Sequence, residues 1–195
     1  MGLRLFVAAQ LSEPVQQHLL TFVEPRMGAD ERLRWSPPEQ WHLTTAFFGD
    51  VAERVVEPLI EELAAAVARS APFEARLRGA GFFGRPEAAR VLWLAVDPGA
   101  EELSALSRRT RNAGSRVGAD PDGAAFTAHL TLARARQRFE VGRWLGILQT
   151  YSGPVFEISE LLLFSSRLHS TGARHEVLAR LPLAGHGTGA TGSTH

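Results

Sequence analysis

Residues 41–48, Trp-His-Leu-Thr-Thr-Ala-Phe-Phe, and residues 126–133, Phe-Thr-Ala-His-Leu-Thr-Leu-Ala, contain the same tetrapeptide pattern, His-Leu-Thr-x. The two histidines, His42 and His129, are 129 − 42 = 87 residues apart. Both segments are short and rich in apolar, aromatic and threonine residues, so we predict that each forms a β-strand. A repeat of this kind indicates two related lobes, each with one copy of the motif.

The spacing within the motif places a histidine and a threonine on one face of each strand. Because successive side chains of a strand point to opposite faces, His42 lies beside Thr44, and His129 lies beside Thr131. If a pseudo-twofold axis relates the strands, two imidazoles and two hydroxyls face each other across a cleft. Displacement at phosphorus needs a base, an acid and hydrogen-bond donors for the phosphate oxygens, and histidine can serve as either acid or base near neutral pH. The repeat therefore predicts a phosphodiester site.

The hydrophobic periodicity outside the motifs predicts alternating strands and helices. Further strands are expected at 3–11, 73–83, 90–97, 154–166 and 175–182, and helices at 12–23, 53–68, 101–116 and 139–149. We predict an α+β fold of two pseudo-symmetric lobes, each an antiparallel sheet with helices on its outer face, around a central cleft. Residues 1–184 are expected to form this single bilobal domain. The Gly-rich tail, 185–195, is expected to be disordered because it has few apolar groups to bury.

The charge of the chain gives no overall attraction to nucleic acid or membrane. All 21 basic residues are arginine, and 21 acidic residues bring the formal net charge to zero. The first hundred residues carry 10 Arg and 13 acids, a difference of −3, whereas the remainder carries 11 Arg and 8 acids, a difference of +3. Any contact with RNA must therefore be local, and arginines of the second half are suited to phosphate because of their planar fork of donors.

The chain has no cysteine, which excludes a disulfide, a Cys-ligated zinc site and a thiol nucleophile. The absence of cysteine is compatible with the reducing cytoplasm. No apolar stretch approaches the roughly 20 residues of a membrane span, and the N-terminus has no features of a targeting segment. We expect a cytoplasmic monomer that has no membrane partner.

Two other interpretations of the motif histidines are a structural role and a role as zinc ligands. An isolated histidine on a strand is more often structural than functional, but a duplicated tetrapeptide favours function. A zinc site would need a third protein ligand, and neither motif holds a carboxylate near its histidine face. We therefore expect no metal and no other cofactor.

The motifs and several further segments resemble one known superfamily. These segments are Arg4-Leu-Phe-Val-Ala, His42-Leu-Thr-Thr-Ala-Phe-Phe-Gly49, Arg90-Val-Leu-Trp-Leu94, Phe126-Thr-Ala-His-Leu-Thr-Leu-Ala-Arg134 and Leu163-Phe-Ser-Ser-Arg-Leu168. The chain is similar over nearly all of residues 3–183 to the two-histidine (2H) phosphoesterases, and within them to the bacterial RNA 2′,3′-cyclic phosphodiesterases, also called 2′-5′ RNA ligases. It departs from the usual family pattern at Thr45, Phe48 and Ala128, and none of these positions supplies a catalytic group.

The resemblance assigns roles to six residues. It implies that His42 is the general acid, that His129 is the general base, and that a set of neighbours binds the substrate: Thr44, Thr131, Arg134 and Phe47. The last two lie five positions after their histidines. In a regular strand an odd offset places them on the opposite face, so each needs a β-bulge or a strand end to reach the cleft.

The resemblance also implies the reaction, which is opening of an RNA 2′,3′-cyclic phosphate to a 2′-phosphate, with 2′-5′ ligation as its reverse. Two alternatives remain: a 2H phosphodiesterase for a small cyclic nucleotide or an ADP-ribose cyclic phosphate, and a non-catalytic module that binds RNA ends. Arg167 and Arg174, on either side of a predicted turn, are interpreted as solvated surface. The other histidines are interpreted as solvated or structural: His18, His169, His175, His186 and His195.

Overall fold

The expected α+β fold is confirmed in the computed structural model, which describes residues 2–137, 139–169 and 172–185. A four-stranded antiparallel sheet has the strand order β3-β1-β8-β9. Its strands are β1 (Leu3–Gln10), β3 (His42–Val51), β8 (Glu160–His169) and β9 (Gly172–Pro182). A five-stranded antiparallel sheet has the order β2-β6-β5-β4-β7. Its strands are β2 (Leu33–Trp35), β4 (Phe73–Arg85), β5 (Ala88–Val96), β6 (His129–Ala135) and β7 (Ser152–Ile158).

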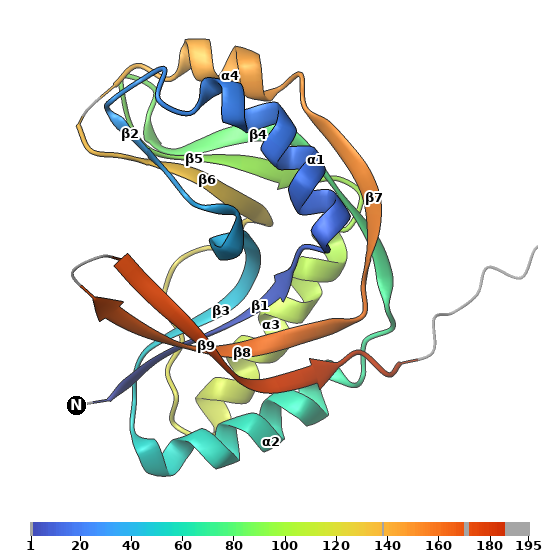
Figure 1. The fold of residues 1–195 in the computed structure, drawn as a ribbon. Coiled ribbons are helices and arrows are strands. Elements are labelled where there is room, and N and C mark those ends of the chain that lie inside the picture. The colour runs from blue at the N-terminus through green and yellow to red at the C-terminus, as the bar shows by residue number, and fades with distance from the viewer. Residues whose placement is uncertain (1, 138, 170–171, 186–195) are drawn as a thin grey trace, which may run out of the picture.

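Helices cover the outer faces of both sheets, and the two sheets curve around an opening between them (Figure 1). The α-helices are α1 (Glu13–Val23), α2 (Val56–Val67), α3 (Ala100–Arg116) and α4 (Gly142–Leu148), with short 3-10 turns at Glu24–Arg26, Pro38–Gln40 and Glu53–Val55. Helices α2 and α3 contact each other and pack on the four-stranded sheet, whereas α1 and α4 contact β7 and β4 of the five-stranded sheet. None of the described helices combines the length and the apolar composition that crossing a bilayer requires.

The helices form where apolar residues recur at helical spacing. In α1 the buried residues are Val15, Leu19 and Val23, each four positions from the next. Such a stripe faces the core and leaves the polar side of the helix in solvent. Helix α3 approaches β3 closely at Gly114, where a Cβ atom would lie 2.3 Å from the ring of Phe48. The absence of a side chain at this position thus sets the distance between α3 and the motif strand.

One continuous core of buried side chains extends through both lobes, and a second, small cluster lies apart from it. The small cluster consists of Phe6, Ala8, Leu162 and Phe164, with Phe47 packed against it. Strand β1 accordingly has five consecutive buried residues, Leu5 to Ala9. A strand that is covered on both faces has a continuous apolar sequence rather than an alternating one.

Several expected boundaries differ from the structure by one to three residues. The expected strand 154–166 is two strands, because the chain leaves the five-stranded sheet after β7 and enters the four-stranded sheet as β8. The expected strand 126–133 begins only at His129. Strand β2 was not predicted, because three residues are too few to establish a period of two.

The division into one domain over 1–184 and a tail stays a prediction. Gly185 donates its backbone N–H to the carbonyl of Ser70, at 3.0 Å. Residues 186–195 of the expected tail, including His186 and His195, lie outside the described residues. Residues 170–171 and the side chains of Arg167, His169 and Arg174 also lie outside the part that the structure describes.

Candidate active site

All six predicted site residues line one cleft of about 620 Å3 between the two sheets. Strand β3 contributes His42, Thr44 and Phe47, and strand β6 contributes His129, Thr131 and Arg134. Each motif histidine is the first residue of its strand. The repeat therefore does bring both imidazoles and both hydroxyls to one cavity.

A β-bulge in each motif strand brings the residue five positions after the histidine into the cleft. The register of β3 against β1 shifts at Thr45, which has no residue opposite it. The register of β6 against β5 shifts in the same way at Leu132. Each bulge adds one residue to its strand and so offsets the odd spacing of five positions. Phe47 and Arg134 therefore lie on the same strand faces as their histidines.

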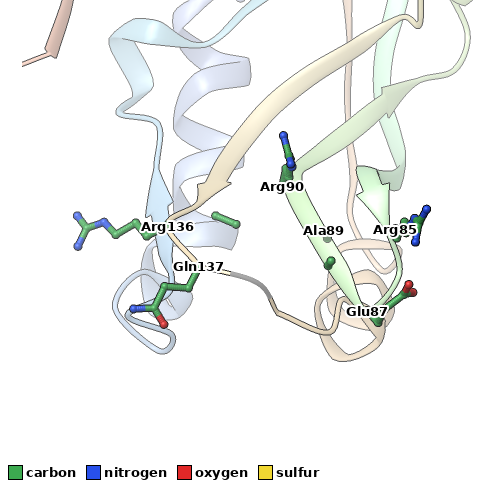
Figure 2. Close-up of a pocket in the computed structure, with 8 residues that line it drawn as sticks. Arg85, Glu87, Ala89, Arg90, Arg136 and Gln137 are labelled. Atoms are coloured by element: carbon green, nitrogen blue, oxygen red, sulfur yellow. The ribbon is translucent and has the colours of Figure 1, made fainter.

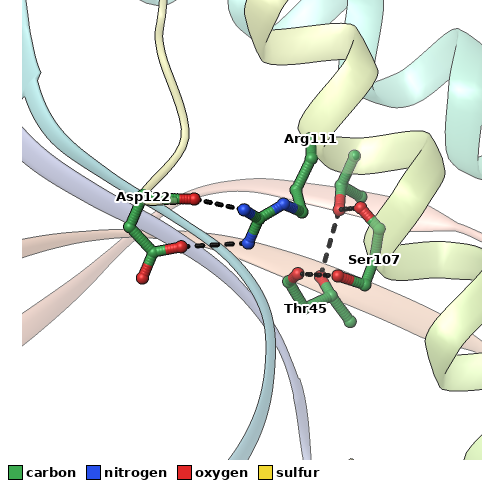
Figure 3. A network of polar contacts seen from close by, with 5 residues as sticks. Thr45, Ser107, Arg111 and Asp122 are labelled. Carbon is green, nitrogen blue, oxygen red and sulfur yellow. Dashed lines mark hydrogen bonds and ion pairs between the residues drawn. The ribbon is translucent and has the colours of Figure 1, made fainter. Parts of the chain in front are cut away.

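The backbone carbonyls of the two bulge residues are satisfied in similar ways. The carbonyl of Thr45 accepts a hydrogen bond from the Ser107 hydroxyl of α3, at 2.7 Å, as Figure 3 shows. The carbonyl of Leu132 accepts a hydrogen bond from the backbone N–H of Ser36, at 2.8 Å. A buried carbonyl without a partner would be costly, so these bonds stabilise the bulged conformation.

His42 lies in an aromatic environment. Its ring stacks on Phe6, with centroids 4.9 Å apart, and the ring of His175 meets it edge-on at 5.8 Å. Burial, followed by the charge of His175, lowers the pKa of His42 to about 4, while a backbone hydrogen bond with Gln40 acts in the opposite direction. The protein groups around His42 therefore keep its imidazole neutral at pH 7.

His129 is also held by the backbone two residues before it. Its Nδ1 lies 2.7 Å from the carbonyl oxygen of Thr127. In the neutral ring Nδ1 must carry the hydrogen of this bond, which leaves the lone pair on Nε2. Burial lowers the pKa of His129, opposed by the bond to Thr127. The ring of Phe83 meets the imidazole edge-on, with centroids 4.9 Å apart.

The cleft is locally cationic although the chain as a whole is neutral. Arg4, Arg34 and Arg134 line it, and no acidic residue does so in the part of the chain that the structure describes. Across those same residues neither Thr44 nor Thr131 uses its hydroxyl in a protein hydrogen bond. Arginines and free hydroxyl donors around two imidazoles form a surface suited to a phosphate group.

Sequence reasoning missed several residues of the cleft. His175, interpreted above as solvated or structural, lines the cleft, contacts Phe6 and His42, and has a buried Nδ1 with no partner among the described residues. It reaches the cleft because it pairs with Ser166 across the β8–β9 hairpin, which no local pattern indicates. Arg34 and Trp35 were missed because β2 was not predicted. His18, in contrast, lies on α1 with its Nδ1 3.1 Å from the Tyr151 hydroxyl.

A second cationic surface lies near the end of β6, whose Arg134 lines the cleft and whose last residue, Ala135, lines another cavity. A cavity of about 720 Å3 is lined by Arg85 and Arg90 from the β4–β5 hairpin and by Arg136, which directly follows β6. Figure 2 shows Arg136 and Arg85 projecting to opposite sides with Arg90 between them. Within the described residues none of these arginines forms an ion pair, and Glu87 is the one acidic residue in the lining.

No group of three or more His, Asp or Glu side chains that could hold a metal ion occurs within the ranges that the structure describes. Two lobes that present paired His-x-Thr strands to one cationic cleft define the two-histidine class of phosphoesterases.

Comparisons with known proteins agree with this class. The model of the family described as LigT-like phosphoesterases matches residues 10–93. A protein of Methanothermobacter thermautotrophicus named RNA 2′,3′-cyclic phosphodiesterase is 31% identical over 88% of this chain and 94% of its own length. The chain belongs to the LigT-like phosphoesterase family.

Another protein of the same name, from Geobacillus stearothermophilus, is 33% identical over 96% of this chain. The chain spans 59% of that relative's length. Among solved structures, TT0787 of Thermus thermophilus has 26% identity and a TM-score of 0.78, over 93% of this chain and 98% of its own. Apo LigT of E. coli has the same fold, with a TM-score of 0.76 at 24% identity over the same shares.

Proposed function

We propose that this chain opens the 2′,3′-cyclic phosphate at the end of an RNA to a 2′-phosphate by histidine acid-base catalysis. The observation that carries the proposal is the pair of His-x-Thr faces that share one cationic cleft free of acidic side chains in its described lining. The name of both relatives, RNA 2′,3′-cyclic phosphodiesterase, supports this choice of substrate.

The proposed reaction is a single in-line displacement at phosphorus. His129 accepts a proton from water through Nε2, and the resulting oxygen attacks the phosphorus atom. The bond from phosphorus to O3′ breaks, and His42 donates a proton to O3′, which becomes a free hydroxyl while the phosphate remains on O2′. Thr44, Thr131 and Arg134 hold the phosphate oxygens, whose negative charge increases in the transition state. The same displacement with a 5′-hydroxyl in place of water would break the bond from phosphorus to O3′ and form a 2′-5′ linkage.

The acid role requires that His42 be protonated when the substrate is bound. Its pKa of about 4 reflects the surrounding protein groups alone. A cyclic phosphate brings one negative charge next to the ring in a partly desolvated site, and a nearby opposite charge raises the pKa of a histidine. We therefore expect substrate binding to favour the protonated form of His42.

The test is incubation of the purified chain with an oligonucleotide that ends in a 2′,3′-cyclic phosphate, followed by identification of the product isomer. The expected product is the 2′-phosphate. A product that is mainly the 3′-phosphate, or no product at all, would refute the proposal.

The same assay separates the two alternatives. Faster turnover of a small cyclic nucleotide or an ADP-ribose cyclic phosphate than of the oligonucleotide would favour the first. RNA-end binding without turnover, unchanged when both motif histidines are replaced, would favour the non-catalytic module. Location in the cytoplasm and the monomeric state stay predictions.

We also predict that the reaction needs no metal ion, because two histidines, two threonines and an arginine can supply proton transfer and charge stabilisation. Activity should persist after dialysis against a chelator. Loss of activity that a divalent ion restores would contradict this prediction.

A further inference from the structure

The cleft also carries polar side chains that the proposed chemistry does not use. Three of them come from neighbouring strands of the four-stranded sheet: Arg4 of β1, Ser166 of β8 and His175 of β9. Ser166 lies directly opposite His175. Leu5 lies opposite Ser165, and one further step of the same antiparallel register brings Arg4 opposite Ser166. We call Arg4, Ser166 and His175 the polar row.

Two members of the polar row have unused hydrogen-bond donors within the part of the chain that the structure describes. In that part Arg4 forms no ion pair, and the Ser166 hydroxyl forms no protein hydrogen bond. The Arg4 guanidinium lies over the ring of Phe47, 5.3 Å from its centroid. The described lining of the cleft contains no acidic side chain that could compete for these donors. A guanidinium and a hydroxyl in this state are suited to binding phosphate oxygens.

His175 connects the polar row to the catalytic pair. Its ring meets the ring of His42 edge-on, with centroids 5.8 Å apart, and the ring of Phe6 edge-on at 4.9 Å. Its Nδ1 is buried and has no partner among the described residues. With Nδ1 enclosed, Nε2 is the ring nitrogen left for a ligand. A group bound by the polar row would therefore lie next to the proposed acid.

The covalent structure of a nucleotide determines on which side its second phosphate lies. In the proposed reaction His42 donates a proton to O3′, so the C3′ side of the ribose lies next to His42. C3′ is bonded to C4′, which carries C5′ and the 5′-phosphate, whereas C2′ is bonded to neither C4′ nor C5′. The 5′-phosphate therefore lies on the O3′ side of the cyclic phosphate. This direction leads past His42 to the polar row, because His175 contacts His42.

We propose that the polar row binds the phosphodiester that precedes the terminal nucleotide of the RNA. The inference rests on the proposed function, and in particular on His42 as the acid. A row that binds this second phosphate favours the end of a strand over a free nucleoside cyclic phosphate, which does not have it. Figure 1 shows the hairpin of β8 and β9 on the open side between the two sheets, where the rest of the strand would continue.

The experiment compares two substrates that differ only in the second phosphate: adenosine 2′,3′-cyclic phosphate with and without a methyl phosphodiester on O5′. The quantity measured is the ratio of their kcat/KM values, which should favour the phosphodiester compound in the wild type. His175→Phe keeps an aromatic ring against Phe6 and His42 but removes the N–H, and Arg4→Ala removes the charge. Because each change removes a hydrogen bond to a charged group, each should lower the ratio roughly 10- to 100-fold.

The matched control is Arg34→Ala. Arg34 of β2 also lines the cleft but belongs to the five-stranded sheet, so its loss removes the same charge from the other lobe. The ratio should stay at the wild-type value in this variant. Equal kcat/KM values for the two substrates in the wild type would refute the proposal. A fall of the ratio confined to Arg34→Ala, or an equal loss on both substrates in His175→Phe and Arg4→Ala, would also overturn it.

If the wild type hydrolyses neither compound, the proposed function fails, and binding then tests the polar row by itself. Adenosine 2′-phosphate with the methyl phosphodiester on O5′ should bind more tightly than adenosine 2′-phosphate without it, and His175→Phe should remove the difference. Equal binding of the two compounds by the wild type would refute the polar row as a site for the second phosphate.

Discussion

At the scale of single residues, two copies of the His-Leu-Thr-x pattern hold two imidazoles that differ in their surroundings. His42 stacks on Phe6 and faces His175, whereas His129 is hydrogen-bonded to Thr127. The sequence repeat predicted the pair but could not predict this difference, because the contacts of His42 come from strands distant in sequence. A substrate with chemically different attacking and leaving groups requires such an asymmetry.

The roles of the two histidines can be separated by the leaving group. We expect His42→Ala and His129→Ala each to lose on the order of 10²- to 10⁴-fold in rate on a cyclic phosphate, because each removes one proton transfer. A phosphodiester with a 4-nitrophenoxide leaving group needs no proton at the departing oxygen. It should restore activity to His42→Ala but not to His129→Ala, and the opposite pattern would reverse the assignment.

The depressed pKa of His42 should make the fold sensitive to acid. The unfolded chain binds a proton at this residue below about pH 6.5, whereas the folded chain does so only near pH 4. Its contribution to stability is therefore complete above pH 6.5 and is lost as the pH falls towards 4. The loss at pH 5 is about 2 kcal/mol.

Urea unfolding at pH 7.5 and at pH 5 measures this effect. His42→Gln, which cannot be protonated in this range, should lose about 2 kcal/mol less than the wild type between the two pH values. An equal loss of unfolding free energy in both proteins would show that protonation of His42 does not contribute to the pH dependence of stability.

At the scale of elements, the bulges decide which side chains reach the cleft. The odd offset of Arg134 and Phe47 predicted that some irregularity must occur in each motif strand, and the register shifts at Thr45 and Leu132 fulfil that requirement. The sequence could not identify the groups that satisfy the bulge carbonyls. These groups are Ser107 and Ser36, and their proximity depends on the packing of distant elements.

Replacement of Ser107 should therefore destabilise the protein more than its small size suggests. Ser107→Ala leaves the buried carbonyl of Thr45 without its hydroxyl partner, and we expect a loss of about 1–3 kcal/mol in the free energy of unfolding. The matched control is Ser104→Ala on the same helix, where the hydroxyl bonds only to the Ala100 carbonyl of that helix. Chemical denaturation of both variants provides the measurement. Equal effects would mean that the bond to the bulge has no special importance.

At the scale of the whole molecule, the sequence predicted the fold class and the opposed lobes but not how the chain is divided between them. Periodicity shows which side chains of a strand face a core but not which sheet the strand joins. The segment 154–166 has one continuous pattern, and yet it contributes β7 to one sheet and β8 to the other. A helix can also pack on a different sheet from the strand before it. Helix α1 follows β1 of the four-stranded sheet but packs on β7 of the five-stranded sheet.

The arginines beyond the cleft should favour long substrates over short ones. Arg85, Arg90 and Arg136 line one cavity, and Arg136 directly follows β6, the strand that carries Arg134 in the cleft, so we expect a strand that leaves the cleft along β6 to contact them. Combined replacement of all three by alanine should lower kcat/KM on an oligonucleotide and weaken its dependence on salt, because fewer counterions are released on binding. A mononucleotide 2′,3′-cyclic phosphate provides the comparison. An equal change on both substrates would exclude a role in binding the strand.

The distribution of strands has a further consequence. In the described residues the chain passes from one sheet to the other between β1 and β2, β2 and β3, β3 and β4, and β7 and β8. A cut in the segment between α3 and β6 would give one fragment with His42 and another with His129, and neither fragment could complete either sheet. Catalysis would then require the two pieces to reassemble. The catalytic rate of such a cut protein would therefore measure how much of the two fragments has associated.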